Sequence, residues 1–370
     1  MRIYVFLVIL INLIACLALR VPIHRRRFPL GSSKKVVALA DGAGGGPQEL
    51  DRCSQYIRDC RNRGPDRWGG SLFGGFVRYL NQVAVGLLFG VLMRVFNSVK
   101  VNNIERLLKQ VETPREDGRP LLSISNHQSM IDDPGLWSGI LPWWRIHPDK
   151  VRWSVCTEGV FFAIGWLTKF MGAGNVLPLD RSGSLNQPAF EYFWEKLNSG
   201  EWCHIFPEGR IWQDWRFDAG EPHMGPFKAG VGKIIAHCKA GREPIIVPMY
   251  HRGMDQIIPE KVLTKKPGSK RAKASKPRVK FPQIGKKVEV WFGEPFDVKE
   301  TVQRFRSSRK DIQALDSWDV SSSDALALYQ EIANEIRERM LDLEATALGK
   351  ESRRDGPPTQ EIDPPKLATA

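Results

Sequence analysis

The chain has 370 residues, of which 42% are hydrophobic and 26% are charged, so it can bury a full core in one large or two small domains. Its net charge of +13 favours anionic partners, namely nucleic acid, an anionic membrane or an acidic substrate. Its six cysteines include no C-x-x-C pair, which argues against a disulfide framework or a zinc cluster.

The first apolar stretch covers residues 3–19, and most of the nearby positive charge follows it, at residues 20 and 25–27. A cleavable signal peptide carries its charge mainly before the apolar run, so this order favours an uncleaved anchor or an organelle-targeting segment. A mis-assigned start codon is the alternative. Residues 31–66 are rich in Gly, Ser, Pro and Arg. We therefore expect residues 1–66 to be an apolar targeting segment and a flexible linker.

A second apolar stretch begins at Leu72 and is interrupted by few polar residues, among them Arg78 and Arg94. Its apolar side chains would lie nearly all round a helix, which favours contact with lipid over a place in a protein core. Charged residues near both ends suit a helix that lies in the bilayer interface. We predict a membrane-associated helix over residues 67–101, with an ordinary core helix as the alternative.

Short apolar runs then alternate with helical patterns. Strands are expected at residues 121–125, 153–156, 176–179, 202–206, 245–250 and 288–292. Apolar side chains at helical spacing predict helices at 188–200, 227–238 and 324–343. The pattern is typical of an α/β fold, a mixed and mostly parallel sheet covered by helices. We expect this domain to span residues 102–345 and the polar tail, residues 346–370, to be disordered.

The segment NHQSMIDDP, residues 126–134, directly follows the first expected strand. His127 and Asp132 are five residues apart and would not share one face of a regular helix, but a histidine in the preceding loop escapes that constraint. An aspartate that accepts a hydrogen bond from one imidazole nitrogen fixes the tautomer, and the other nitrogen can then take a proton from a hydroxyl. No protein nucleophile is needed if the substrate supplies that hydroxyl.

Two further strand ends carry arginines. FPEGR, residues 206–210, contains Pro and Gly that force a turn and expose Glu208 and Arg210, and PLDR ends another strand with Arg181. A guanidinium beside exposed backbone N–H groups can bind a phosphate. A phosphate-binding pocket beside a His–Asp base is suited to acyl transfer onto the hydroxyl of a glycerophospholipid.

These motifs resemble the paired signature of the glycerolipid acyltransferase family, and the similarity covers about residues 120–300. The resemblance implies that His127 is the base and Asp132 its partner. The substrate contacts that it implies are Asn126, Arg181, Glu208, Gly209 and Arg210. The chain departs from the family pattern in its front end, in a basic insert at 261–287, and in Arg210, where a lysine is more familiar.

Three longer stretches narrow the resemblance to family members that remodel phospholipids: NHQSMIDDP at 126–134, EKLNSGEWCHIFPEG at 195–209 and PIIVPMYHRGM at 244–254. This implies transfer of an acyl chain between a phospholipid and a lysophospholipid without a cofactor, with cardiolipin and related lipids as substrates. It also implies a mitochondrial membrane, outer or inner, facing the intermembrane space. The rivals are an acyl-CoA-dependent lysophosphatidate acyltransferase with the same dyad and a catalytically silent membrane scaffold.

Other polar residues near the motifs have simpler interpretations. A metal site at His127, Asp132 and Asp133 is disfavoured because no second histidine lies at ligand spacing, so no metal is expected. Asp133 is interpreted as a cap of the following helix. His204 is interpreted as a buried, hydrogen-bonded histidine and His251 as a structural residue at the border of the pocket.

The basic insert at 261–287 holds eleven basic residues and no acidic residue. It contains no nucleic-acid-binding motif and few aromatic residues, so we do not expect nucleic acid as a partner. Attraction to an anionic membrane surface, at about 1 kcal/mol per basic residue near the surface, fits the rest of the chain better, with a solvated loop as the alternative.

Overall fold

The computed structural model describes residues 56–58, 60, 72–113, 118–142, 145, 150–157, 171–180, 185–217, 221–239, 241–260, 262–264, 273–275, 281–308 and 323–350. The first apolar stretch, Arg181 and most of the C-terminal tail lie outside these ranges, as does much of the basic insert. Tyr56, Ile57 and Cys60, which we expected in the linker, are instead buried in the hydrophobic core.

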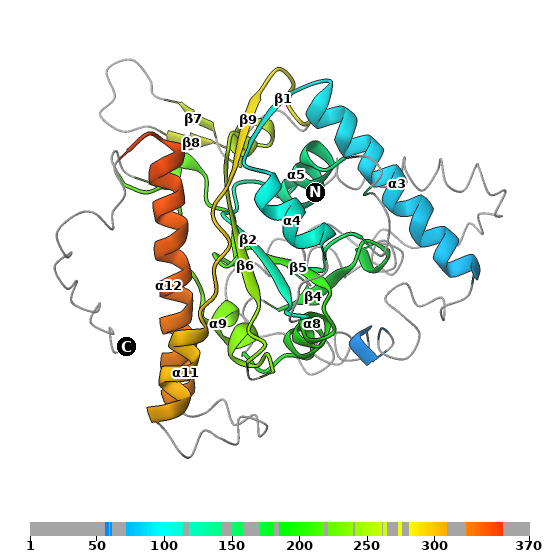
Figure 1. Ribbon diagram of the computed structural model, residues 1–370. Coiled ribbons are helices and arrows are strands. Elements are labelled where there is room, and N and C mark those ends of the chain that lie inside the picture. The colour runs from blue at the N-terminus through cyan, green and yellow to red at the C-terminus, as the bar shows by residue number, and fades with distance from the viewer. Residues whose placement is uncertain are drawn as a thin grey trace, which may run out of the picture.

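The described elements follow one another in the α/β order that the sequence predicts (Figure 1). They are α3 (Leu72–Arg94), β1 (Ser98–Asn102), α4 (Glu105–Glu112), β2 (Leu121–Ser125), α5 (Asp132–Ile140), β3 (Ser154–Thr157), β4 (Val176–Leu179), α8 (Pro188–Asn198), β5 (Trp202–Ile205), the 3-10 helix η2 (Asp214–Arg216), α9 (Ala229–Ala236), β6 (Ile245–Arg252), α10 (Met254–Ile257), β7 (Val262–Thr264), β8 (Lys273–Ser275), β9 (Lys287–Phe292), α11 (Lys299–Ser308) and α12 (Ser323–Ala347).

The central sheet has the strand order β1-β9-β6-β2-β5, and all its neighbours are parallel except the antiparallel pair β6–β9. The parallel pair β3–β4 is attached at the β5 edge, because Trp153 forms a bridge with Cys203. The predicted mixed and mostly parallel sheet is confirmed, and each of the six expected strands is present to within two residues of its bounds.

Helices cover both faces of the sheet, with α3, α4 and α5 on one side and α9 and α12 on the other (Figure 1). Side chains alternate along the strands: Leu121 and Val247 belong to the α5-side core, whereas Leu122 and Ile246 belong to the α12-side core. At Gly232 of α9, an added Cβ would meet the carbonyl oxygen of Tyr329 at 1.9 Å, so only glycine allows α9 and α12 to approach this closely.

Helix α3 ends at Arg94 rather than continuing to residue 101, and residues 98–102 form the unpredicted strand β1. The chain turns at Asn97, whose Nδ2 donates to the carbonyl of Leu92 at 2.8 Å and whose Oδ1 accepts from the N–H of Lys286 at 2.9 Å. A short apolar run can belong to a strand or to a helix. The continuous apolar stretch therefore did not show where the helix ends and the strand begins.

Helix α3 is docked on the domain through polar side chains. Arg78 donates to Asn175 Oδ1 at 2.7 Å, Gln82 donates to the carbonyl of Ala173 at 2.9 Å, and Arg94 donates to the carbonyl of Ser138 at 3.2 Å. The opposite side exposes large apolar residues, namely Phe76, Tyr79, Leu87 and Val91. In the described part of the chain, its segment Gly75–Arg94 alone is long and apolar enough to cross a membrane.

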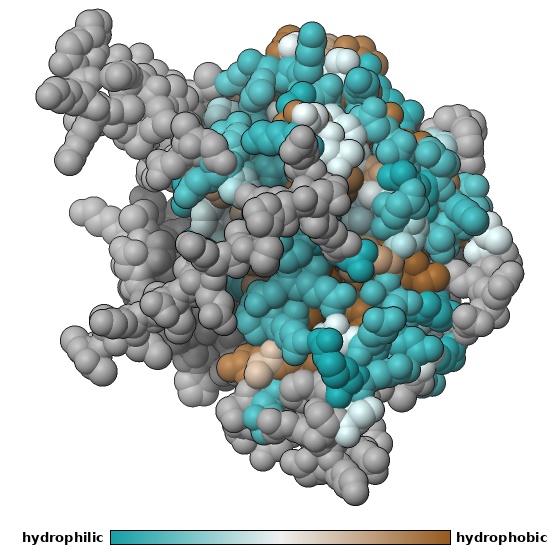
Figure 2. Space-filling view, turned by 60° about the vertical axis from the view of Figure 1, so that its left-hand side comes forward, coloured by the Kyte–Doolittle hydropathy of each residue, from teal (hydrophilic) through white to brown (hydrophobic). Residues whose placement is uncertain are grey.

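A different surface comes forward in Figure 2, where described residues are mainly hydrophilic and apolar side chains gather only in small patches. Within the basic insert, residues 262–264 and 273–275 form the antiparallel pair β7–β8, which the sequence did not predict. Among the exposed large hydrophobic residues of the described part of the chain, Phe76, Tyr79, Leu87 and Val91 lie on α3.

Candidate active site

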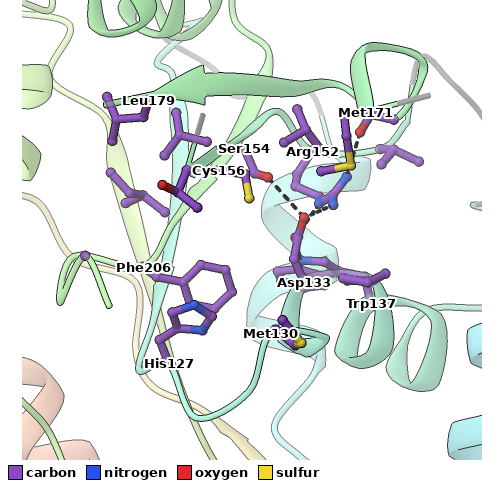
Figure 3. Close-up of a pocket in the computed structure, with 18 of the residues that line it drawn as sticks. His127, Met130, Asp133, Trp137, Arg152, Ser154, Cys156, Met171, Leu179 and Phe206 are labelled. Carbon is purple, nitrogen blue, oxygen red and sulfur yellow. Dashed lines mark hydrogen bonds and ion pairs between the residues drawn. The ribbon is translucent and has the colours of Figure 1, made fainter. Parts of the chain in front are cut away.

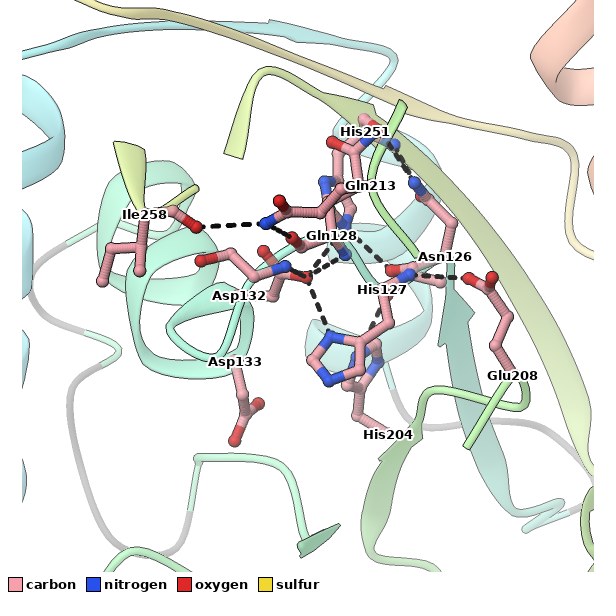
Figure 4. Close-up of polar contacts among 12 residues, drawn as sticks. Asn126, His127, Gln128, Asp132, Asp133, His204, Glu208, Gln213, His251 and Ile258 are labelled. Atoms are coloured by element: carbon pink, nitrogen blue, oxygen red, sulfur yellow. Dashed lines mark hydrogen bonds and ion pairs between the residues drawn. The ribbon is translucent and has the colours of Figure 1, made fainter. Parts of the chain in front are cut away.

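The ends of β2, β5 and β6 meet at one edge of the sheet. Parallel pairing aligns Ile124 with Ile205 and Ser125 with Met249, so the residues that follow β2 and β5 lie beside the last residues of β6. The carboxyl edge of parallel strands is the usual place for a site in an α/β fold. The sequence therefore brings residues 126–132, 206–209 and 251 together (Figure 4).

His127 and Asp132 form a hydrogen-bonded pair. His127 lies in the loop after β2, Asp132 is the first residue of α5, and the distance from His127 Nδ1 to Asp132 Oδ2 is 2.9 Å. The side chain of Asp132 is fully buried, whereas that of His127 is 20% exposed. Because the carboxylate accepts from Nδ1–H, the hydrogen-bond network assigns the proton to Nδ1 and leaves Nε2 as an acceptor.

The turn between the two residues holds the carboxylate in place. Asp132 Oδ2 also accepts the backbone N–H groups of Gln128 at 2.6 Å and Ser129 at 2.8 Å, and the N–H of Asp132 donates to the carbonyl of Ser129. An acidic residue in the first helical turn is further favoured by the helix dipole. The five-residue spacing therefore works through a compact loop and not through a shared helix face.

Asn126 and His251 join the ends of β2 and β6. Asn126 Nδ2 donates to the carbonyl of His251 and Asn126 Oδ1 accepts its N–H, both at 2.9 Å, while His251 Nε2 is 2.8 Å from the carbonyl oxygen of Asn126. Burial lowers the pKa of His251, which favours its neutral form. Both side chains are buried, and Asn126 fixes the loop that carries His127, while its expected contact with the substrate stays a prediction.

Glu208 has a similar supporting place. Its Oε1 accepts the N–H of His127 and its Oε2 accepts the N–H of Gly225, both at 2.7 Å. The side chain is buried, and burial raises the pKa of Glu208 to about 8 although the two N–H bonds oppose this. We expected Glu208 beside a phosphate, but its carboxylate faces two backbone donors and bridges the loops at 127 and 225.

His127 opens into a cavity of about 470 Å³. Its ring stacks on Phe206 with the centroids 4.3 Å apart, and both side chains lie in the pocket (Figure 3). The lining is mainly apolar and comes from α3, α5, β3, β4, α8 and α9; it includes Val85, Trp137, Leu141, Val176, Leu179 and Phe190. Such a cavity can take an apolar chain and present it to the imidazole.

Asp133 lines this cavity and does not cap α5, contrary to our expectation. It accepts from Arg152 Nε at 2.8 Å and from Arg152 Nη2, from Ser154 Oγ at 3.0 Å, and from Trp137 Nε1 at 3.1 Å. Burial raises the pKa of Asp133, but the charge and hydrogen bonds of Arg152 outweigh this effect and keep that pKa below its usual value. The cavity wall therefore holds an ion pair.

His204 lies in the sheet beneath the dyad. It is buried, with Nδ1 2.9 Å from Ser123 Oγ and Nε2 3.4 Å from Ser125 Oγ. Burial lowers the pKa of His204 to about 3, so the ring is neutral near pH 7. The interpretation of His204 as a buried, hydrogen-bonded residue is confirmed.

The remaining expected contacts differ in position. Gly209 lines the cavity and has φ of +66°, which the turn after Glu208 requires. Arg210 is exposed and stacks over the ring of Trp212 at 4.3 Å, outside the cavity lining. Arg181 lies outside the described residues, so its contact with phosphate stays a prediction.

Sequence reasoning missed two residues that shape the site. Gln213 donates to the carbonyls of Gln128 at 2.9 Å and Ile258 at 3.1 Å, and so it ties the loop that carries His127 to the segment after α10. Arg152 directly precedes an expected strand. Arginine is rarely buried, so its place beside a buried strand is the one sequence signal that could have identified it. Among the described residues, no three His, Cys, Asp or Glu side chains are grouped to hold a metal ion.

Comparisons with known proteins show what this chain is similar to. Residues 98–252 match the sequence profile of a family described as Acyltransferase. "Taffazin" of Dictyostelium discoideum is 29% identical over 230 residues, which are 60% of this chain and 72% of that protein. "Tafazzin" of Drosophila melanogaster is 34% identical over 220 residues, 59% of this chain and 51% of that protein.

A third relative has a different name. "N-acylphosphatidylethanolamine synthase" of Arabidopsis thaliana is 28% identical over 232 residues, which are 62% of this chain and 75% of that protein. The chain thus spans about half of the Drosophila relative and about three quarters of the other two. The matched region contains both members of the His127–Asp132 pair, and the resemblance inferred from the motifs is confirmed.

Proposed function

Because this chain belongs to the glycerolipid acyltransferase family, we propose that it is a phospholipid–lysophospholipid transacylase that works without coenzyme A. In this reaction the fatty acyl group of a phospholipid ester moves to the free hydroxyl of a lysophospholipid. Cardiolipin and related phospholipids are the proposed substrates. The donor and the product belong to the same chemical class, so the reaction would run in both directions.

The proposed mechanism uses His127 as general base. Nε2 takes the proton of the lysophospholipid hydroxyl while its oxygen attacks the ester carbonyl of the donor. Asp132 holds Nδ1–H at 2.9 Å and stabilises the imidazolium that forms. The imidazolium then returns the proton to the departing oxygen of the donor, which leaves as a new lysophospholipid.

The single observation that carries the proposal is the place of the dyad. A base that is only 20% exposed faces a mainly apolar cavity, next to a helix whose outer side is also apolar. Both substrates of a transacylase are lipids, and both need an apolar path to the base. An acyl-CoA donor would add a large polar nucleotide. The described cavity lining is mainly apolar and so suits a lipid donor better.

The direct experiment mixes the purified protein with a phospholipid that carries a labelled acyl chain and with an unlabelled lysophospholipid. Label should pass to the lysophospholipid without added coenzyme A. Transfer that needs acyl-CoA would instead identify the lysophosphatidate acyltransferase. Lipid binding without transfer from either donor would identify a scaffold.

A second acceptor is favoured by the Arabidopsis relative, whose name describes acylation of an amine. The same base could deprotonate the ammonium group of phosphatidylethanolamine, and the resulting amine would attack the donor ester. Adding phosphatidylethanolamine as acceptor in the same assay separates the two. N-acylated product at a rate above that of the hydroxyl acceptor would favour the amine reaction.

The proposal also places the enzyme on a mitochondrial membrane facing the intermembrane space, held by α3 and by attraction of the basic insert to anionic lipid. The exposed apolar residues of α3 and the eleven basic residues at 261–287 support membrane attachment. Fractionation of cells that express the full chain, with protease protection of the separated mitochondria, tests both the compartment and the orientation.

A further inference from the structure

Arg152 is a buried cation in the cavity wall, and neither the dyad nor the expected phosphate contacts account for it. Its side chain is 8% exposed. Nε and Nη2 donate to Asp133, and Nη1 donates to the carbonyl of Gly174 at 3.2 Å. A guanidinium has five N–H groups. Within the described residues, these bonds use three of them and leave two for a ligand.

The pair lies next to the catalytic dyad. Asp132 and Asp133 are consecutive at the start of α5, about 100° apart around the helix, so one carboxylate turns to His127 and the other to the cavity. Figure 3 shows Asp133 and Arg152 in the same pocket as the His127 ring. In a lysophospholipid, the reactive hydroxyl and the phosphate belong to one glycerol unit, so a phosphate contact must lie near the base.

Among the described residues, the lining has cationic side chains at Arg145, Arg152 and Lys228 and acidic ones at Asp133 and Asp180. Arg145 is bonded to Glu112 at 3.0 Å, but its Nε is buried with no hydrogen-bond partner, and its side chain is 7% exposed. The rest of the lining is mainly apolar. This combination suits an anionic head on an apolar chain.

We propose that Arg152 contacts the phosphate of the lipid bound in this cavity and that Asp133 positions its guanidinium. The inference rests on the proposed function and names a phosphate contact of that site. Guanidinium and phosphate form charge-assisted hydrogen bonds through paired N–H groups. Arg152 is then a specificity-determining residue that favours lysophospholipids over uncharged monoacylglycerols of the same chain length.

The test measures binding rather than turnover. Purified full-length protein in detergent is titrated with fluorescent lysophosphatidic acid and with a monoacylglycerol that carries the same labelled chain. Arg152→Gln should raise the Kd for lysophosphatidic acid about tenfold or more and leave that for the monoacylglycerol within about twofold. Arg152→Lys keeps the positive charge but lacks the paired N–H groups of the guanidinium, so its loss of affinity for lysophosphatidic acid should be smaller.

Two further variants protect the test against a folding defect. Arg152→Gln leaves Asp133 buried without its partner, so Asp133→Asn/Arg152→Gln removes both charges and should keep a melting temperature near that of the wild type. It should still lose the preference for phosphate. Arg119→Gln is the matched control, because Arg119 also bonds an aspartate, Asp297, and a carbonyl, that of Glu243, away from the cavity.

Several results would overturn the inference: equal weakening of both probes, an unchanged phosphate preference in the folded double variant, or the same loss in Arg119→Gln. Inorganic phosphate should displace lysophosphatidic acid only at far higher concentration, and displacement at equal concentration would identify a small-anion site instead. If the wild type binds as expected but transfers no acyl chain, the proposed function fails while the role of Arg152 stands.

Discussion

The loop that carries His127 and the helix α3 both border the cavity, but they are held in different ways. The loop is fixed from several sides at once: Asp132 accepts two of its N–H groups, Glu208 accepts the N–H of His127, and Asn126 pairs with the backbone of His251. Most of these donors are backbone groups, which have little freedom to move. These contacts therefore restrict the movement of the loop and of the proposed base.

Helix α3 is held on one side only. Arg78 and Gln82 form hydrogen bonds with the segment 173–175. Phe89 and Met93 are buried in the α5-side core. The other side leaves Leu87 58% exposed. The difference teaches that many hydrogen bonds hold the loop of the proposed base, whereas the outer side of α3 leaves apolar side chains exposed.

The largest effect should come from removing the base. We expect His127→Ala to lower the rate of acyl transfer about 10²- to 10⁴-fold while the melting temperature stays close to that of the wild type, because the side chain is partly exposed and does not hold the core. Rates and thermal unfolding of purified protein check this. His223→Ala, which changes a histidine outside the cavity lining, is the control and should keep full activity.

Asp132→Asn should reduce the rate about 10²-fold or more. The asparagine keeps the shape of the loop, but its amide group competes as a donor where the carboxylate now accepts three N–H groups. The measured rate constant should fall more than the apparent affinity for lysophospholipid. A change confined to affinity would mean that Asp132 holds substrate and does not assist the base.

Glu208→Gln should have a smaller and pH-dependent effect. The amide can accept only one of the two N–H groups, so we expect a loss of about 1–3 kcal/mol in the free energy of unfolding at pH 5. In the wild type, the raised pKa of Glu208 gives stability that is complete below about 4.5 and is lost as pH rises through about 8. The variant should lack this decline.

Urea unfolding at intervals between pH 5 and pH 8 measures that slope. Gln213→Ala is the matched control, since it also removes a side chain that bridges two loops but cannot titrate. It should lower stability by a similar amount at every pH. An unchanged slope in Glu208→Gln would assign the pH dependence to another group.

The smallest effect on stability is expected at the outer side of α3. Leu87→Gln should change the free energy of unfolding by less than about 0.5 kcal/mol but weaken binding to phospholipid vesicles. Phe89→Ala, on the buried side of the same helix, should instead cost about 3 kcal/mol or more of stability. Equal vesicle binding by Leu87→Gln and the wild type would make α3 an ordinary surface helix.

The same contrast explains how much the sequence could predict. The His127–Asp132 pair, the strands around it and the shared sheet edge follow from short-range patterns, because the loop's contacts join neighbours in sequence or paired strands. The contacts of Asn126 and Glu208 with backbone groups were not predicted, for one reason. A motif reveals that a polar residue is at the site, but not whether it faces the substrate or a backbone N–H group.

Contacts between segments that are not paired strands could not be predicted. The ion pair of Asp133 with Arg152 and the docking of α3 on residues 173–175 depend on how distant segments pack. The turn at Asn97 was hidden because its flanks are apolar on both sides, and the burial of Tyr56 and Ile57 was hidden by the polar composition around them.

The most direct test of the central claim compares His127→Ala, Asp132→Asn and the double variant in the assay without coenzyme A. If Asp132 acts only through the imidazole of His127, the double variant should transfer acyl chains no more slowly than His127→Ala alone, to within about twofold. Losses that multiply would show that the two residues work independently. That result would contradict the dyad.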